Sequence, residues 1–149
     1  MGTPYEKLYE NLLPKFKSYE IPLMSIREVK ELLHDYLLPA TVNFHGCRKD
    51  LSDRDEIYER FNIDLEDDEI EILSNFMLLE YIDSNYVRTP TLLQVNLSST
   101  DFNAFSPANF LKELLEMQNV YSEKNETLLS RYAWKADKTT FKFGKKIKK

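Results

Sequence analysis

The segment 67–83 constrains the fold of this chain more than any other, because read as a helix it is apolar on most of its sides. One side carries apolar residues at helical spacing, interrupted once by an acid: Ile70, Leu73, Phe76, Met77, Glu80 and Tyr81. Ile72, Leu79 and Ile82 broaden the coverage. The acidic first turn suits the positive end of a helix dipole. Such a helix needs neighbours on several sides, so we expect it at the centre of a helical bundle.

A second helix is predicted to begin at Ser25. Ser25 and Glu28 have the spacing of a capping box, in which the hydroxyl and the carboxylate each accept a backbone N–H. Apolar residues then recur on one stripe: Ile26, Val29, Leu32, Leu33, Tyr36 and Leu37. Pro39 removes a backbone donor and is expected to kink or end the helix near residue 38, with 40–44 as a continuation beyond a kink.

Two shorter helices are expected in the N-terminal half of the chain. The first spans about residues 4–13, with Thr3 as its N-cap and Pro4 at its first position, and it stops before Pro14. The other spans about residues 53–61 and follows turn and cap residues.

The last helix is predicted to begin with Ser106 as N-cap and Pro107 at its first position, and to run to about residue 134. Two apolar groups lie along it: Leu111, Leu114, Leu115, Met117 and Tyr121, and then Leu128, Leu129, Tyr132 and Trp134. The wholly polar segment 122–127 separates them. The second group therefore packs either on something outside the core or, if the helix bends, back onto its own domain. Residues 84–99 are left open between helix, strand and loop.

The tail at 135–149 is predicted to be an extended basic arm. Phe141 and Phe143 would share one face if this segment formed a short strand. Such a strand would add to a sheet edge of its own chain or of a partner, and disorder until a partner binds is the alternative. The predicted fold is thus all-α: a compact bundle of about four to five helices with a long C-terminal helix. Residues 1–134 form the helical domain and 135–149 the basic C-terminal arm.

Charge is sorted into two blocks of opposite sign. Residues 50–83 hold thirteen acidic and two basic residues, a net charge of −11, whereas 131–149 hold eight basic residues and one acidic residue, a net charge of +7. This pattern favours binding to a second copy or to an oppositely charged partner. We place the partner-binding residues at the C-terminal end: Tyr132, Trp134, Phe141, Lys142, Phe143, Lys145 and Lys146.

Catalytic and cofactor chemistry is not expected. The three glycines do not form a phosphate-binding loop. His34, His45 and Cys47 are too few and too scattered for a zinc site, and the acidic run 50–56 lacks the spacing and glycine of a calcium loop. The single cysteine excludes an internal disulfide. Apolar runs of about four residues are far short of the roughly 18 that a membrane span needs. We therefore expect no enzyme, no cofactor, no metal and no membrane partner.

The chain resembles the head–tail connector (neck adaptor) proteins of tailed bacteriophages and prophages. The resemblance lies in 64–73 (DLEDDEIEIL) leading into 76–81 (FMLLEY), and in 99–102 (STDF) followed by 105–114 (FSPANFLKEL). It implies small helical subunits that form a ring, commonly of twelve copies, in the virion neck beneath the portal. The expected partners are further copies, the portal protein and a tail or head-closure protein. Assembly would take place in the bacterial host cytoplasm, and acidic side chains lining the lumen would keep passing DNA mobile without sequence-specific contact.

Two other functions stay open at this point. The lysine tail could bind nucleic acid phosphates in a small DNA-associated or regulatory protein, although the chain as a whole has a net charge of −5. Another head-completion or tail-completion protein of similar size is the third reading.

Overall fold

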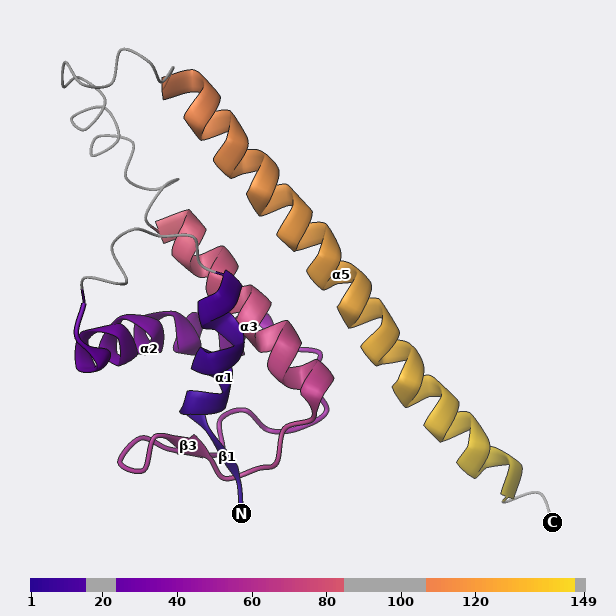
Figure 1. Cartoon of the computed structure of the whole chain (residues 1–149). Helices are drawn as coiled ribbons and strands as arrows, with labels where there is room; N and C mark the ends of the chain where they lie inside the picture. Colours follow the sequence, from indigo (N-terminus) through magenta and orange to yellow (C-terminus); the bar gives the residue numbers. More distant parts are fainter. Residues whose placement is uncertain (16–23, 85–106, 147–149) are drawn as a thin grey trace.

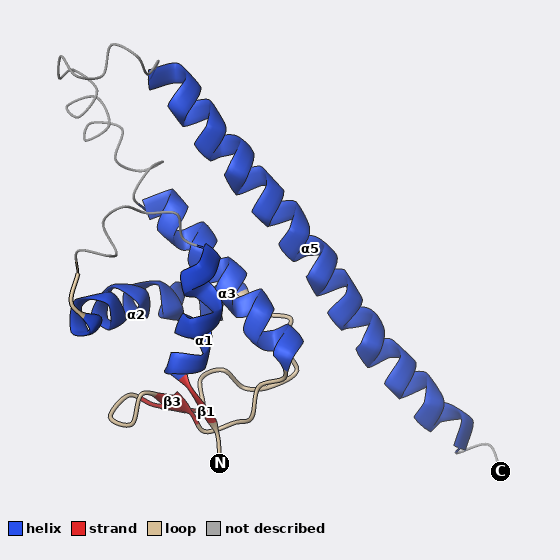
Figure 2. Cartoon of the chain, viewed as in Figure 1, coloured by secondary structure: helices blue, strands red, loops and turns tan. Residues whose placement is uncertain are grey.

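The computed structural model describes residues 1–15, 24–84 and 107–146, with side chains in the last range for 112, 113 and 115–135. Its elements are β1 (Thr3–Pro4), α1 (Tyr5–Leu12), the 3-10 turn η1 (Leu13–Lys15), α2 (Ile26–Asn43), β2 (Arg54–Asp55), β3 (Arg60–Phe61), α3 (Asp67–Ile82) and α5 (Pro107–Lys146). The described part of the chain is mostly helical, as predicted, with a small antiparallel sheet in the order β1-β3-β2 (Figure 2).

Helix α3 is the central element, which confirms the prediction made from the apolar residues on most of its sides. It packs against α1, α2 and α5 (Figure 1). Ile72, Leu73, Met77 and Leu78 are almost completely buried within it. Glu66 and Glu69 form a capping box at its start, so the acidic first turn stabilises the helix.

Helix α2 confirms the second predicted capping box. Ser25 Oγ accepts from the backbone N of Glu28 at 3.3 Å, and Ser25 N donates to Glu28 Oε2 at 2.8 Å. Pro39 lies inside the helix and does not end it. Ala40 and Phe44, both buried, pack into the core just beyond the proline, and this packing holds the last turn in place.

Helix α1 begins one residue later than predicted, with Pro4 rather than Thr3 at the N-cap. Thr3 does not cap the helix because the Thr3 hydroxyl accepts from the backbone N of Leu65 at 2.8 Å. The backbone N–H of Thr3 donates to Ile63 O at 3.0 Å, which ties the N-terminus to the segment before α3. The helix ends before Pro14, as expected, and Pro14 lies in the 3-10 turn.

The helix predicted at 53–61 is wrong, because this segment forms the β2–β3 hairpin. Asp55 Oδ1 accepts from the backbone N of Ile57 at 2.9 Å and of Tyr58 at 3.1 Å, which turns the chain. Glu59 then takes a left-handed φ of 48°. The returning strand pairs with β1 as well as β2 and buries Phe61 in the core.

Helix α5 begins at Pro107 as predicted, while the expected cap Ser106 and the open segment beyond Ser84 lie outside the described residues. The helix has 40 residues and continues to Lys146. At 1.5 Å per residue this is about 60 Å, against about 24 Å for α3. The extended tail and the strand at 140–143 are therefore corrected to helix. Residues 135–143 contain no proline or glycine, so a helix already docked on α3 continues through them.

In the described ranges, no helix is both long enough and apolar enough to cross a bilayer.

Candidate partner-binding site on helix α5

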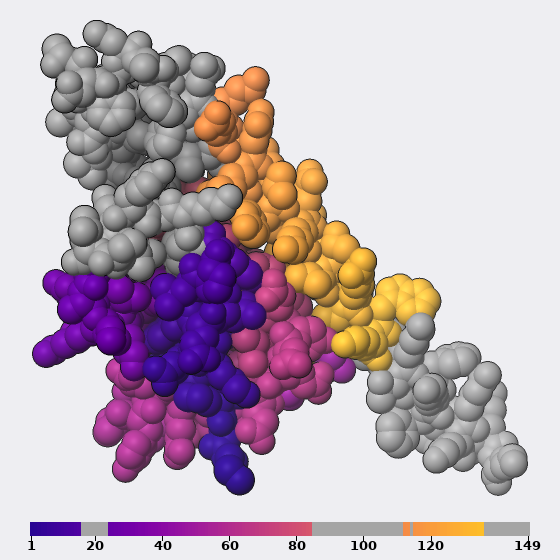
Figure 3. All heavy atoms as spheres, viewed as in Figure 1, coloured from indigo at the N-terminus to yellow at the C-terminus, as the bar shows by residue number. Residues whose placement is uncertain are grey.

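One side of α5 packs along α3, and it includes residues from both predicted apolar groups. Asn125 and Tyr132 are its most buried described residues. Met117, Tyr121, Leu128 and Leu129 are half-buried against the same core. The helix is straight (Figure 1), and one side of it lies against the flank of the body (Figure 3). Leu128, Leu129 and Tyr132 of the second group therefore pack on their own domain without a bend in the helix. Asn125 of the polar segment faces the same interface.

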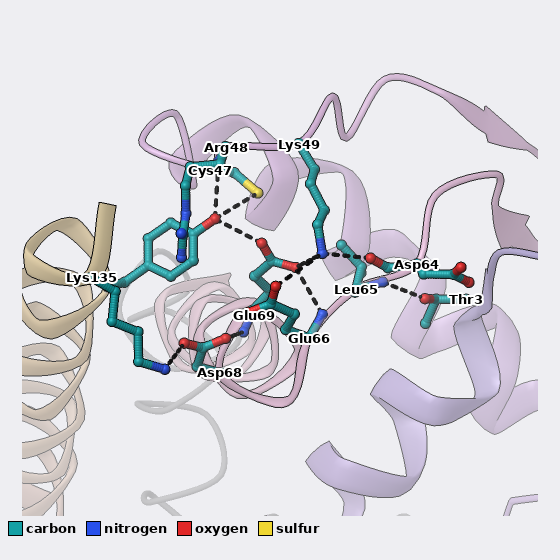
Figure 4. Close-up of polar contacts among 11 residues, drawn as sticks. Thr3, Cys47, Arg48, Lys49, Asp64, Leu65, Glu66, Asp68, Glu69 and Lys135 are labelled. Atoms are coloured by element: carbon teal, nitrogen blue, oxygen red, sulfur yellow. Dashed lines mark hydrogen bonds and ion pairs between the residues drawn. The ribbon is translucent and has the colours of Figure 1, made fainter. Parts of the chain in front are cut away.

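Tyr132 fastens α5 to the body through a buried carboxylate. Its hydroxyl donates to Glu69 Oε1 at 2.7 Å, and Lys49 Nζ donates to Glu69 Oε2 at 2.8 Å (Figure 4). The Glu69 side chain also accepts from the backbone N of Glu66 at 2.8 Å. Tyr132 is 3% exposed and Glu69 is 1% exposed. One carboxylate therefore joins the start of α3, the segment before it and α5.

The segment 44–48 surrounds the other side of Tyr132. The backbone N of Arg48 donates to the Tyr132 hydroxyl at 3.0 Å, and its guanidinium lies 4.1 Å from the ring centroid. The ring of Phe44 lies 5.5 Å from the same centroid, and Cys47 Sγ lies 3.9 Å from the hydroxyl. Tyr132 is thus a core residue of this chain, and we remove it from the set of residues offered to a partner.

The electrostatics keep this cluster in one protonation state. Burial, with the hydrogen bond to Glu69, raises the pKa of Tyr132 to about 12. Burial alone would raise the pKa of Glu69, but hydrogen bonds from Lys49, Glu66 N and Tyr132 outweigh it and hold that pKa below its usual range. Glu69 is therefore ionised and Tyr132 neutral near neutral pH.

Some of the acidic and basic residues of the two charged blocks pair with each other within the chain. Lys135 Nζ pairs with Asp68 at 2.8 Å, and the pair joins the first lysine of the basic block to the acidic start of α3 (Figure 4). Lys135 is largely exposed, so this pair orients α5 more than it stabilises the fold. The remaining lysines of α5, from position 138 onward, follow the last contact that the structure describes between α5 and the body.

A second polar contact lies midway along the α3–α5 interface. Asn75 Nδ2 donates to Asn125 Oδ1 at 3.4 Å. Lys15 Nζ donates to Asn75 Oδ1 at 2.7 Å and to Glu71 Oε1 at 2.7 Å. Buried polar pairs between helices fix their register, because a slip leaves them unsatisfied. The position of α5 along α3 is therefore set at two places, Asn125 and Tyr132.

Beyond this contact, α5 carries the other residues that the sequence singled out. Trp134 is 64% exposed. It lies about 200° around the helix from Tyr132, on the side away from α3. α5 also spans the remaining residues predicted to bind a partner, but their side chains lie outside the described ones: Phe141, Lys142, Phe143, Lys145 and Lys146. Phe141 and Phe143 therefore lie in a helix and not in the strand expected for them.

Sequence reasoning missed the groups that hold α5. Glu69 stands three residues after Glu66, which is the capping-box spacing, and that signal was available. Arg48 and Lys49 form a basic pair directly before the acidic block, a weaker signal.

Other candidate chemistry is sparse where side chains are described. His34 Nε2 lies 2.8 Å from Glu56 Oε2, and His45 Nδ1 lies 2.8 Å from Val42 O, so the two histidines serve separate local contacts. Among the described residues, no three His, Cys, Asp or Glu side chains are grouped to hold a metal ion.

No protein-family model, curated protein or solved structure matches this chain.

Proposed function

We propose that this protein is a non-enzymatic structural subunit that assembles through helix α5: a head–tail connector (neck adaptor) of a tailed phage or prophage, which forms a ring between portal and tail. The observation that carries the proposal is that α5 is locked to the body at Tyr132 and then continues as a helix through Lys146. These 14 further positions include Trp134 and four lysines after Lys135. A helical arm held at a fixed angle is suited to docking.

The lock at Glu69 supports an assembly role. A docking arm ordered before binding loses less conformational entropy when it binds than a flexible tail does. Tyr132, Lys135 and Asn125 together fix the rotation and register of α5, so they also fix the direction of the Trp134 side. The exposed aromatic Trp134 is of the residue type that dominates binding energy at interfaces.

The distribution of charge supports repeated contacts between copies. An acidic body and a basic arm on one chain suit a heterologous interface, in which two neighbouring copies contact each other through different surfaces. Contacts of this kind close into a ring if the rotation between copies allows it. Portal protein and a tail or head-closure protein are the further proposed partners. The proposed location is the virion neck, with DNA passing through the lumen.

A DNA-associated function is the second candidate, and one observation favours it. The sequence places lysines at positions 135, 138, 142, 145 and 146, and α5 runs through all of them. Lysines at this spacing along a helix suit contacts with successive phosphates.

The test compares the full chain with a version that ends at residue 135, which retains Tyr132 and Lys135. Mass measurement and negative-stain imaging, with and without portal rings, read out assembly. We expect the full chain to form rings or decorate portal rings, and the shortened chain to do neither. The connector function is contradicted if the full-length protein stays monomeric and does not bind portal rings. Salt-sensitive DNA binding lost in the shortened chain would favour the second candidate instead.

A further inference from the structure

Helix α5 lies on the outside of the body, along α3 (Figure 1). The core of the body forms among α1, α2, α3 and the hairpin, where residues such as Leu8, Leu37 and Leu73 have no exposed surface. Of the α5 side chains that the structure describes, Tyr132 is the one apolar side chain buried in that core. The body therefore has a core largely of its own, and α5 is an added layer.

The polar contacts between α3 and α5 define how the two helices align. Three pairs join them: Asp68–Lys135, Glu69–Tyr132 and Asn75–Asn125. Because positions rise along α3 as they fall along α5, the helices are antiparallel. Continued at 1.5 Å per residue, this register places Pro107 about 18 Å beyond the end of α3 at Ile82.

The connection between the two helices is much longer than this distance requires. Since α3 ends at Ile82 and α5 begins at Pro107, 24 residues connect them. At about 3.3 Å per residue, a chain of this length spans at most about 80 Å. It therefore allows α5 to reach its own α3 or the α3 of a neighbouring copy. Such a tether holds α5 at its own α3 with an effective concentration of at most about millimolar, so a second copy competes when copies are similarly concentrated.

The side of α3 that receives α5 has polar groups that select this helix. The buried carboxylate of Glu69 and the buried amide of Asn75 would each lose a hydrogen bond if a different helix took its place. Every copy of the chain carries the matching groups, Asn125, Tyr132 and Lys135, at the required spacing. The receiving surface and the helix are therefore complementary whether they belong to one copy or to two.

The contact between α3 and α5 is not fully satisfied. Asn125 Nδ2 is buried, and among the described atoms it has no hydrogen-bond partner. This group regains water when α5 leaves α3, which offsets part of the cost of opening. The ion pair between Lys135 and Asp68 is largely exposed on the lysine side and adds little. These features suit a helix that opens while the body stays folded.

We propose that α5 is exchanged between copies, so that the α5 of one copy docks on the α3 of the next. The exchanged helix makes the same contacts with Glu69 and Asn75 that it makes within one chain. Docking within one chain prevails in dilute solution, and exchange prevails at the high local concentration of an assembly. The exchanged contact repeats from copy to copy and closes a ring if the rotation allows it. This inference rests on the proposed assembly function and names its contact.

The pair of Lys135 and Asp68 reports the exchange in the unmodified protein. Copies grown with ¹⁵N are mixed with unlabelled copies in urea, refolded together near millimolar concentration and treated with a carbodiimide, which joins a lysine to a carboxylate in contact. We expect Lys135–Asp68 links of mixed isotope content, rising toward half of these links in an equimolar mixture as the concentration increases. Lys135–Asp68 links of single isotope content alone, at every concentration, overturn the inference. The control is the link between Lys49 and Glu66, which pair at 3.8 Å within the body and should keep a single isotope content.

The second test places the two members of this pair on different chains. Asp68→Lys and Lys135→Asp each set like charges together when α5 docks in its own chain or on an identical copy. In a mixture of the two variants, exchange of α5 brings opposite charges together again. We expect sedimentation equilibrium to show association about fivefold or more stronger in the mixture than in either variant alone. A mixture that associates no more strongly than the separate variants overturns the inference. The double variant restores the pair within one chain and is the matched control, which should associate as the unmodified protein does.

The two proposals fail in different ways. Rings whose Lys135–Asp68 links are all of single isotope content refute the exchange and leave the connector function standing. Mixed-isotope links in a protein that forms only dimers or open filaments and does not bind portal rings support the exchange and refute the connector function.

Discussion

The Tyr132 hydroxyl of α5 donates a 2.7 Å hydrogen bond to the buried carboxylate of Glu69 at the start of α3. This carboxylate is also the N3 member of the α3 capping box and the partner of Lys49. The bond therefore connects the docking of a peripheral helix with the start of the central one. Loss of either partner is therefore expected to affect both helices.

Tyr132→Phe should lower the free energy of unfolding by about 1–3 kcal/mol, because it leaves Glu69 Oε1 and the backbone N of Arg48 without their buried partner. Urea unfolding measures the change. Tyr58→Phe, which removes the hydroxyl of a 70% exposed tyrosine, is the matched control and should change stability by less than about 0.5 kcal/mol. Equal effects of the two substitutions would mean that the hydroxyl of Tyr132 does not hold α5.

Glu69→Gln should weaken the dependence of stability on acidic pH. Glu69 has a lower pKa in the folded chain than its ordinary 4.5, so the folded state binds fewer protons there. Its contribution is complete above that ordinary value and is lost as the pH falls through the folded pKa. The measurement is the free energy of unfolding at pH values from neutral to below 4.5. The variant should be less stable at neutral pH and lose less on acidification. A parallel decline in both proteins would show that Glu69 does not carry this dependence.

Gly2→Ala should destabilise the N-terminal part of the fold. Gly2 has a φ of 93°, and a Cβ built there would lie 2.3 Å from the carbonyl oxygen of Phe61. The strain should cost about 1–3 kcal/mol in unfolding free energy, because β1 must move away from β3 to relieve it. Gly46→Ala is the control, since a Cβ at Gly46 meets no atom within 4 Å. If the two alanines have the same effect in urea unfolding, the N-terminus is not held against β3 as described.

Local patterns in the sequence were sufficient to predict the elements that nearby residues stabilise. The Ser25–Glu28 capping box and the all-round apolar character of 67–83 predicted α2 and the central α3, because both depend on spacing within one helix. The hairpin at 54–61 was missed because its stability comes from distant groups. Phe61 pairs with Thr3, and Tyr5 binds the carbonyl of Glu59, and no local pattern reveals either contact.

The candidate site was predicted only in part for a similar reason. The C-terminal position of Trp134 and the lysines followed from composition along the chain. The role of Tyr132 depended on Glu69, 63 residues away, and on the backbone of Arg48. An aromatic residue near the end of a long helix has the same local pattern whether it packs inward or binds a partner. The helical tail was missed because the alternation of polar and apolar residues at 140–143 resembled a strand. The segment is helical because the helix extends into it from the docked part of α5.

Thr140→Pro should separate the role of the arm from the stability of the body. Proline at 140 removes a backbone donor and clashes with the carbonyl of residue 136, so it breaks α5 five residues beyond Lys135, the last residue of α5 with a described contact to the body. Helical circular dichroism should fall, and the unfolding free energy should change by less than about 0.5 kcal/mol, because the described side-chain contacts between α3 and α5 end at Lys135. Binding to portal rings, or to DNA if the second candidate function holds, should be lost. Thr140→Ala is the control and should preserve all three properties. A large loss of stability in Thr140→Pro would place the arm against the body, and intact binding would place the partner site elsewhere.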